Sequence, residues 1–401
     1  MVVLVCFVAL VSVVLGKNED YIGHRVYYVN ITNQYQQDNF HFLKSDVVDY
    51  WRKPSLEYGV VGQAMVPPSH FDWFEEQLQA LGMPKHLFID DVFEYLKDKD
   101  NPTVRTARAD NNVSNEFDYR GYYRYNDILN HLTSLEATLV NSDVNLQVVE
   151  YGRTDQDRPL IYVRISNRDN TVRPVVVIEA AINPRDWITI PSAIYVIDRL
   201  LDDQRRLLDQ FHWIVIPVLN PDGYEYTHTN LRLWTKSRST RSNVGIICPG
   251  VNINRNFDMD WLRFDSSSSP CSHLYGGVEP FSEIESRLVR SLLEEYGRRI
   301  ALYISLQNNG GYVSYPWLYE RAASGMFRHH HLLGMEMVDA MDSNYLLGVG
   351  SVVLGDRASG TSADYIRYHD VLYSYNIDIV QRDGVVIPEQ DIQGIVDHVW
   401  R

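Results

Sequence analysis

The feature that most constrains this chain is a pair of almost continuous apolar runs near its middle. They cover residues 173–181 (RPVVVIEAA) and 212–219 (HWIVIPVL). A run that does not alternate with polar residues is typical of parallel strands buried on both faces beneath helices. A third such run covers residues 300–306, and residues 187–201 and 281–296 have helical spacing. From Phe117 onward the sequence therefore predicts an α/β domain.

The residues before this domain predict a small α+β unit at about 21–96. Strand patterns occur at 24–29, 60–66 and 86–89, and a helix is expected at 70–81, between Pro67-Pro68-Ser69 and Gly82. Apolar residues at helical spacing predict another helix at about 37–51. Residues 97–112 are charged, so we expect an exposed linker in which trypsin-like proteases cut at Arg105 or Arg108.

The first 16 residues predict a secretory signal peptide. They carry no charged side chain, and the run is shorter than the roughly 20 residues that span a bilayer. Gly16, two residues after Val14, fits a cleavage site, and the alternative is an N-terminal membrane anchor. We therefore expect a secreted, extracellular protein. Cys6 would be removed, and Cys248 and Cys271 would pair in an oxidising compartment. Asn30 and Asn112 begin acceptor sequons for glycosylation.

Charge and histidine content narrow the choice of partners. A net charge of −15 argues against a broad basic face for nucleic acid or an anionic membrane. Thirteen histidines leave room for a metal site, so their positions decide the matter. The run His329-His330-His331 falls in a helical pattern, where consecutive side chains point in different directions. We interpret it as a solvated helix face.

The second domain contains an ordered set of motifs: Tyr151-Gly152-Arg153-Thr154, Arg158-Pro159-Leu160, Asn220-Pro221-Asp222-Gly223-Tyr224, Arg232-Leu233-Trp234 with Lys236 and Arg238, Gly250-Val251, Asn254-Arg255-Asn256 and Ala358-Ser359-Gly360. These motifs resemble those of the secreted zinc carboxypeptidases of the carboxypeptidase A/B type. Cys248 and Cys271 also match the family's disulfide in position. The first unit resembles the family's pro-domain, and the linker resembles its activation segment.

The resemblance implies both a fold and a division of the chain. The expected fold is a mixed, twisted eight-stranded sheet with helices on both faces, preceded by a small α+β pro-domain with an antiparallel sheet. We expect a signal peptide at 1–16, the pro-domain at 17–98, the linker at 99–116 and the carboxypeptidase-like domain at 117–401. The final helix, at 391–401, looks shorter than the family's.

The family's metal ligands are the first point of departure. The resemblance implies zinc held by His-x-x-Glu and a later His, but these positions hold Asn183, Asp186 and Gln307. Amide oxygens are weak donors for zinc, which prefers nitrogen, sulfur or carboxylate. Asp186 is shorter than Glu by roughly 1.5 Å, where sites tolerate about 0.5 Å. Asn252 replaces the Asp that orients a ligand His. We therefore expect no zinc cofactor.

The catalytic positions that the resemblance assigns are substituted as well. The general-base Glu corresponds to Asp378, the oxyanion-stabilising Arg to Thr235, and the mobile Tyr that closes over substrate to Asp356. Losing one oxyanion donor alone costs about 100- to 1,000-fold in turnover. Without a metal there is also no activated hydroxide at neutral pH. The sequence therefore predicts a chain that does not hydrolyse peptides by the family mechanism.

The residues that grip a peptide C-terminus match better. Asn254 and Arg255 match the carboxylate clamp, and Arg185 matches a further subsite arginine. Ala363 corresponds to the pocket floor and predicts a pocket open to apolar side chains. The alternative for Arg255 is a structural ion pair, with Asp356 or Asp378 as its partner.

Three functions remain open from sequence alone. The leading hypothesis is a secreted pseudoenzyme that binds peptide or protein C-termini, another protease or an inhibitor. The second is an active carboxypeptidase with altered or weak metal chemistry. The third is a storage or structural protein with no affinity for peptides.

Overall fold

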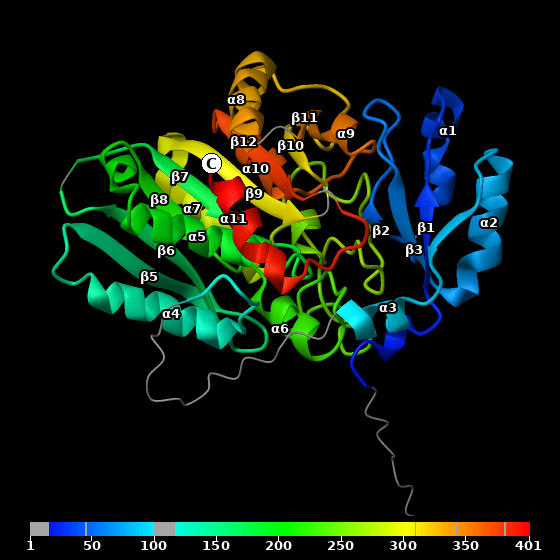
Figure 1. Ribbon diagram of the computed structural model, residues 1–401, viewed down its shortest axis with the longest axis horizontal. Helices are drawn as coiled ribbons and strands as arrows, with labels where there is room; N and C mark the ends of the chain where they lie inside the picture. The colour runs from blue at the N-terminus through cyan, green and yellow to red at the C-terminus, as the bar shows by residue number, and fades with distance from the viewer. Residues whose placement is uncertain are drawn as a thin grey trace, which may run out of the picture.

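A computed structural model describes residues 16–44, 46–99, 117–169, 171–308, 310–341, 344–380 and 382–401. Residues 1–15 of the predicted signal peptide, Arg105 and Arg108 of the linker, and the sequon at Asn112 lie outside the described residues. Asn30 is described and exposed, at the end of a strand. Figure 1 shows a small N-terminal unit in blue beside a larger α/β domain.

The N-terminal unit is a four-stranded antiparallel sheet with helices against it. The order of its strands is β2-β3-β1-β4. The strands are β1 (Arg25–Val29), β2 (Asp49–Arg52), β3 (Gly62–Val66) and β4 (His86–Ile89), and the helices are α1 (Gln34–Asp38), α2 (Phe71–Ala80) and α3 (Val92–Lys99). Alternation along β1 sets its two faces. Tyr27 and Val29 pack under α2, whereas Val26 faces a cluster that includes Leu233 of the larger domain.

The prediction of a helix at 37–51 is wrong. The segment contains the end of α1, a 3₁₀ turn at Phe40–Leu43 and the strand β2. The apolar residues Phe40, Leu43, Val48 and Trp51 are buried, as their spacing suggested, but in two separate clusters. Pairing of β2 with β3 outweighs the local helical pattern, because tertiary contacts can override local propensity.

The larger domain contains the mixed eight-stranded sheet that the sequence predicts. Its strand order is β11-β10-β12-β9-β7-β8-β6-β5. The strands are β5 (Val144–Arg153), β6 (Pro159–Asn167), β7 (Val175–Glu179), β8 (His212–Ile216), β9 (Ile300–Asn308), β10 (Tyr312–Tyr315), β11 (Leu346–Val349) and β12 (Tyr373–Ile379). The apolar runs become β7, β8 and β9, which pair in parallel at the centre of the sheet.

Helices cover both faces of this sheet (Figure 1). The helices are α4 (Tyr125–Thr138), α5 (Thr189–Leu201), α6 (Pro221–Thr229), α7 (Ile284–Tyr296), α8 (Phe327–Ala340), α9 (Gly350–Val353), α10 (Ser362–Tyr368) and α11 (Ile392–Trp400). Along β7, Val176 and Ile178 pack with α4, α5 and α11, whereas Val175 and Val177 pack with α7 and α10. Two apolar layers therefore enclose the central strands.

Two further features concern processing and location. Cys248 and Cys271 form a disulfide, with their Cα atoms 4.8 Å apart, as predicted. Among the residues that the structure describes, no helix combines the length and the apolar character needed to cross a membrane.

Candidate functional site

The candidate site lies where the central strands end. The loop after β7 carries Asn183, Arg185 and Asp186. Gln307 near the end of β9 pairs in register with Asp378 of β12. Because β7 and β12 flank β9 in the sheet, these side chains from three segments converge at one edge. The structure therefore brings together most of the residues that the resemblance assigns to metal and catalysis.

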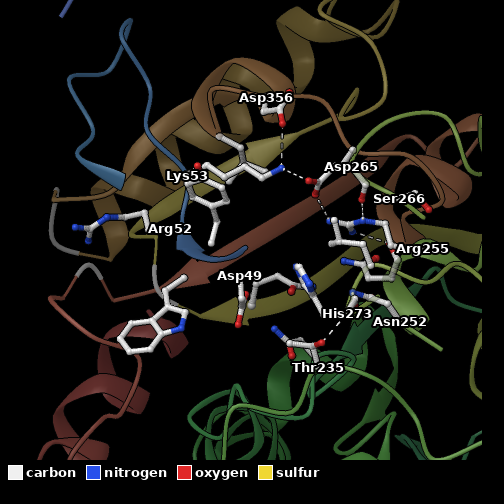
Figure 2. A pocket seen from close by; sticks show the side chains of 18 of the residues that line it. Asp49, Arg52, Lys53, Thr235, Asn252, Arg255, Asp265, Ser266, His273 and Asp356 are labelled. Atoms are coloured by element: carbon white, nitrogen blue, oxygen red, sulfur yellow. Dashed lines mark hydrogen bonds and ion pairs between the residues drawn. The ribbon is translucent and has the colours of Figure 1, made fainter. Parts of the chain in front are cut away.

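A cavity of about 370 Å³ opens at this edge, and the N-terminal unit forms one of its walls. Asn183, Arg185, Gln307 and Asp378 line it from the larger domain. The N-terminal unit contributes the lining residues Lys44, Asp46, Val48, Asp49, Tyr50, Trp51, Arg52 and Lys53. In Figure 2, Asp49 and Lys53 extend into the cavity from this unit. The intact chain thus covers its own candidate site.

Two of the three predicted ligand positions, Asn183 and Gln307, line the cavity, and the third, Asp186, is buried beside it. We use the term floor for these three residues together with Asp378. Asn183 Oδ1 is buried and has no hydrogen-bond partner among the described residues. Gln307 donates from Nε2 to Ser305 Oγ at 2.7 Å. Asp186 accepts a backbone hydrogen bond from Asn308 at 3.2 Å. Burial raises the pKa of Asp186 to about 7 although Arg185 opposes the rise. Two amides and one buried carboxyl of raised pKa do not fit a zinc ion, which needs three deprotonated nitrogen, sulfur or carboxylate donors.

Asp378 and Thr235 line the cavity at two of the predicted catalytic positions. Burial and the neighbouring Asp186 carboxyl raise the pKa of Asp378 well above its ordinary value. The Thr235 hydroxyl donates to the backbone carbonyl of His273 at 3.4 Å, and Asn252 donates to the same oxygen at 3.2 Å. His273 in turn contacts the backbone carbonyl of Asp46 in the N-terminal unit at 3.0 Å. This side of the cavity therefore contributes neutral polar contacts.

Arg255 and Asn254 lie together on the opposite side. Arg255 donates from one Nη to an Asp265 carboxylate oxygen at 2.7 Å and from Nε to the Asp265 carbonyl at 2.6 Å. Its other Nη reaches the Asn254 carbonyl at 2.9 Å, while Asn254 Oδ1 accepts from the backbone of Ser362 at 3.0 Å. Arg255 thus forms an ion pair, as the alternative from sequence had it. Its partner is Asp265, however, whereas the sequence analysis named Asp356 or Asp378.

Asp265 belongs to a charged rim that the sequence did not single out. We use the term charged rim for Lys44, Lys53, Arg255, Asp265 and Asp356. The Lys53 ammonium lies 2.8 Å from Asp265 and 3.2 Å from Asp356, and Lys44 lies 2.7 Å from Asp356. Figure 2 shows Lys53 between the two carboxylates. No spacing in the sequence signals this rim, because its two lysines and two aspartates come from distant segments of different domains.

The rim charges set one another's pKa. Burial raises the pKa of Asp265, but Lys53 and Arg255 outweigh it and hold the pKa well below its usual range. The pKa of Asp356 is lowered in the same way, with Lys53 and Lys44 outweighing burial. Burial lowers the pKa of Lys53, yet Asp265 and Asp356 raise it overall. All three groups are therefore ionised near neutral pH.

Arg185 makes a second ionic contact between the two domains. It donates to the Asp49 carboxylate, and both side chains are almost fully buried. Burial alone lowers the pKa of Arg185, but Asp49 outweighs it and raises the pKa. Arg232 supports the loop by donating to the Arg185 carbonyl at 2.8 Å. Ala363 lies in α10, fully buried in the apolar cluster against β9.

The histidine run needs a correction. His330 on α8 is fully buried against Tyr315 and Tyr375, so the run is not a wholly solvated face. Burial lowers the pKa of His330 to about 4. The packing of α8 onto β10 turns this one histidine inward, because side chains 100° apart on a helix cannot share one face. Within the described ranges, no group of three or more His, Cys, Asp or Glu side chains is placed to hold a metal ion.

Comparisons with known proteins agree with this architecture. The model of the zinc carboxypeptidase family matches residues 133–401, and that of the carboxypeptidase activation peptide matches residues 27–99. Carboxypeptidase B from Helicoverpa zea is 32% identical, and the alignment covers 98% of this chain and 95% of that protein.

Two solved structures are also similar. The carboxypeptidase A from Helicoverpa armigera superposes with a TM-score of 0.86 at 30% identity, covering 95% of each chain. Bovine thrombin-activatable fibrinolysis inhibitor, solved in complex with a tick carboxypeptidase inhibitor, gives a TM-score of 0.63 at 27% identity over 70% of this chain and 95% of that one. The chain therefore belongs to the zinc carboxypeptidase family and carries its activation-peptide domain.

Proposed function

We propose that this protein is a secreted pseudoenzyme that binds peptide or protein C-termini without hydrolysing them. The observation that carries the proposal is the floor of the cavity, where Asn183, Asp186 and Gln307 stand at the predicted ligand positions. Asp186 alone has an ionisable side chain, and burial raises its pKa to about 7. A catalytic zinc site needs three protein ligands in deprotonated form.

The other substitutions point the same way. Thr235 replaces a positive charge with a hydroxyl that donates to a backbone carbonyl, so it offers no stabilisation to an oxyanion. Burial and the neighbouring Asp186 raise the pKa of Asp378, at the proposed general-base position, and so favour its protonated form. A protonated carboxyl cannot accept the proton of an attacking water. Each loss by itself slows hydrolysis, and here they occur together.

Two arginines support the binding half of the proposal. Arg185 is buried and pairs with the Asp49 carboxylate of the N-terminal unit. A buried guanidinium needs an anionic partner, so a ligand carboxylate is a suitable replacement when Asp49 leaves. Arg255, beside Asn254, already pairs with Asp265 and offers a weaker second contact. The related bovine protein solved with a tick carboxypeptidase inhibitor makes an inhibitor a reasonable partner class here too.

The test compares peptide binding with peptide release. The chain is treated with trypsin to cut the predicted linker, and calorimetry is run with one peptide in free-acid and C-terminally amidated forms. We expect binding of the free acid at least about tenfold tighter than binding of the amide, and no release of C-terminal residues by mass spectrometry. Equal affinity for the two forms would show that Arg185 and Arg255 do not bind the C-terminal carboxylate. Turnover that is lost on chelation would make the protein a metallocarboxypeptidase.

A further inference from the structure

The Lys53 side chain occupies the charged rim in the way that a bound ligand would. It comes from the N-terminal unit, and its ammonium reaches Asp265 at 2.8 Å and Asp356 at 3.2 Å in the larger domain. The Lys53 side chain is 16% exposed, Asp265 6% and Asp356 17%, so these charges meet largely out of water. Figure 2 shows the lysine directed between the two carboxylates across the cavity.

Among the charged-rim residues, the larger domain by itself supplies more negative charge than positive charge. Asp265 and Asp356 bring two carboxylates, and Arg255 is the cation of the same domain that pairs with Asp265. Lys44 and Lys53, which balance the remainder, both belong to the N-terminal unit. A buried carboxylate without a partner is costly, so the larger domain is built to receive a cation there.

The hydrogen bonds of the two carboxylates select the kind of cation. One oxygen of Asp265 already accepts from Arg255, and one oxygen of Asp356 accepts from the backbone of Arg357 at 2.8 Å. Lys53 contacts the other oxygen of each carboxylate, and at Asp356 it shares that oxygen with Lys44. A guanidinium gains most from two parallel bonds to one carboxylate, whereas an ammonium is a compact charge with three separate donors. The arrangement favours lysine over arginine.

We propose that Asp265 and Asp356 form a lysine-binding subsite, filled in the intact chain by Lys53, and that the ligand which replaces it is a peptide with a lysine side chain. This proposal rests on the proposed function and gives its peptide a chemical class. It also differs from the expectation drawn from Ala363, which is buried under the sheet and predicts an apolar preference. The selecting groups are at the rim of the cavity.

The experiment uses the full-length chain with Lys53→Ala, which removes the ammonium and leaves a hole. Propylammonium has the shape of the missing atoms, propanol is its neutral control, and propylguanidinium tests the choice of cation. We expect propylammonium to raise the melting temperature of K53A in a saturable way, with an apparent affinity about tenfold above that of propylguanidinium. Propanol and the unsubstituted chain should show no such rise.

A second pair of probes brings in the peptide chemistry. N-acetyl-lysine and N-acetyl-norleucine both carry a carboxylate, and only the former carries the ammonium. We expect N-acetyl-lysine alone to stabilise K53A, and Asp265→Asn in the same background to abolish the effect. Should K53A fail to fold with and without amine, Lys53→Ser is measured in its place.

The proposal is overturned if norleucine and lysine derivatives stabilise the variant equally, or if propylammonium does no more than propanol. Because propylammonium carries no carboxylate, such a failure leaves the clamp at Arg185 and Arg255 untouched. Conversely, equal binding of free-acid and amidated peptides would refute the proposed carboxylate clamp without contradicting the lysine subsite.

Discussion

The candidate site contains two pairs of aspartates that differ in the charges around them. On the floor, Asp186 and Asp378 lie near each other, and the adjacent Arg185 is paired with Asp49. At the charged rim, Asp265 and Asp356 lie among Lys44, Lys53 and Arg255. Burial raises the pKa of the floor pair, whereas the cations outweigh burial at the rim and lower the pKa of that pair.

This difference in pKa means that the floor and the charged rim suit different kinds of ligand. Amides and carboxyls of raised pKa are poor ligands for a divalent cation, and a carboxyl of raised pKa is a poor base until it loses its proton. A rim of fixed charges between two domains can hold a ligand or a pro-domain in a defined position. The scaffold of the zinc carboxypeptidase family thus carries a network of fixed charges at the rim of this cavity.

The largest expected effect is at the rim. Asp265→Asn leaves Lys53 and Arg255 facing a neutral amide in a buried place, and removing one partner of a buried ion pair costs about 3 to 5 kcal/mol. Urea unfolding monitored by fluorescence measures the loss. The matched control is Asp90→Asn, which breaks the more exposed pair with Arg25 and should cost less than about 1 kcal/mol. Similar losses in the two variants would show that the rim is not a buried network.

The next largest effect is the pH dependence of the stability that Asp186, on the floor, contributes to the folded chain. The folded-state pKa of Asp186 is about 7, above the value near 3.9 in the unfolded chain, so the folded state holds more protons between these values. The contribution of Asp186 to stability is therefore present at acid pH and is lost as pH rises from about 4 to 7. Asp186→Asn removes this loss, and its stability relative to the unsubstituted chain should rise by about 2 to 4 kcal/mol from pH 5 to 8.

Denaturant unfolding at several pH values gives the comparison for Asp186→Asn. The rim aspartates have the opposite sign, because their folded-state pKa is lowered. Their contribution is present above about pH 4 and is lost as pH falls through the folded-state pKa. A stability difference for D186N that is constant with pH would mean that Asp186 is already ionised, and the floor would then resemble the rim.

Much of the fold could be predicted from sequence, because strongly apolar runs leave few alternatives. The runs at 173–181 and 212–219 become central parallel strands, and the disulfide forms between the only two cysteines after the signal region. The helix predicted at 37–51 was wrong, because its apolar residues serve a short turn and the strand β2. Local spacing does not distinguish these cases when tertiary pairing decides.

The candidate site, like the fold, could be predicted from sequence only in part. The ordered motifs correctly predicted that Asn183, Gln307, Asp378 and Arg255 lie around one cavity, with Asp186 buried beside it. The roles of Lys53 and Asp265 could not be predicted, because each depends on a partner in another domain. Lys53 follows the strand β2, and Asp265 precedes a run of serines. From sequence alone, each of these charged side chains would be expected at the solvent-exposed surface.

The smallest predicted effect ranks the two lysines of the rim. Lys53 contacts both aspartates, whereas Lys44 contacts Asp356 alone and is more exposed, at 25% against 16%. Lys53→Met should therefore cost about 1 kcal/mol more than Lys44→Met in urea unfolding of the full-length chain. An equal cost for the two variants would place the main contact of the rim at Asp356 and weaken the case for a subsite shared by two carboxylates.

We expect the floor not to hold zinc, and the metal content of the purified chain decides this. The purified full-length chain is dialysed against micromolar zinc and then against metal-free buffer, and zinc is measured by plasma mass spectrometry. Asn183→His, Asp186→Glu and Gln307→His combined in one chain serve as the reference for a restored ligand set. We expect well under one zinc per unsubstituted chain and a clear rise in the triple variant. One tightly held zinc per unsubstituted chain would contradict it.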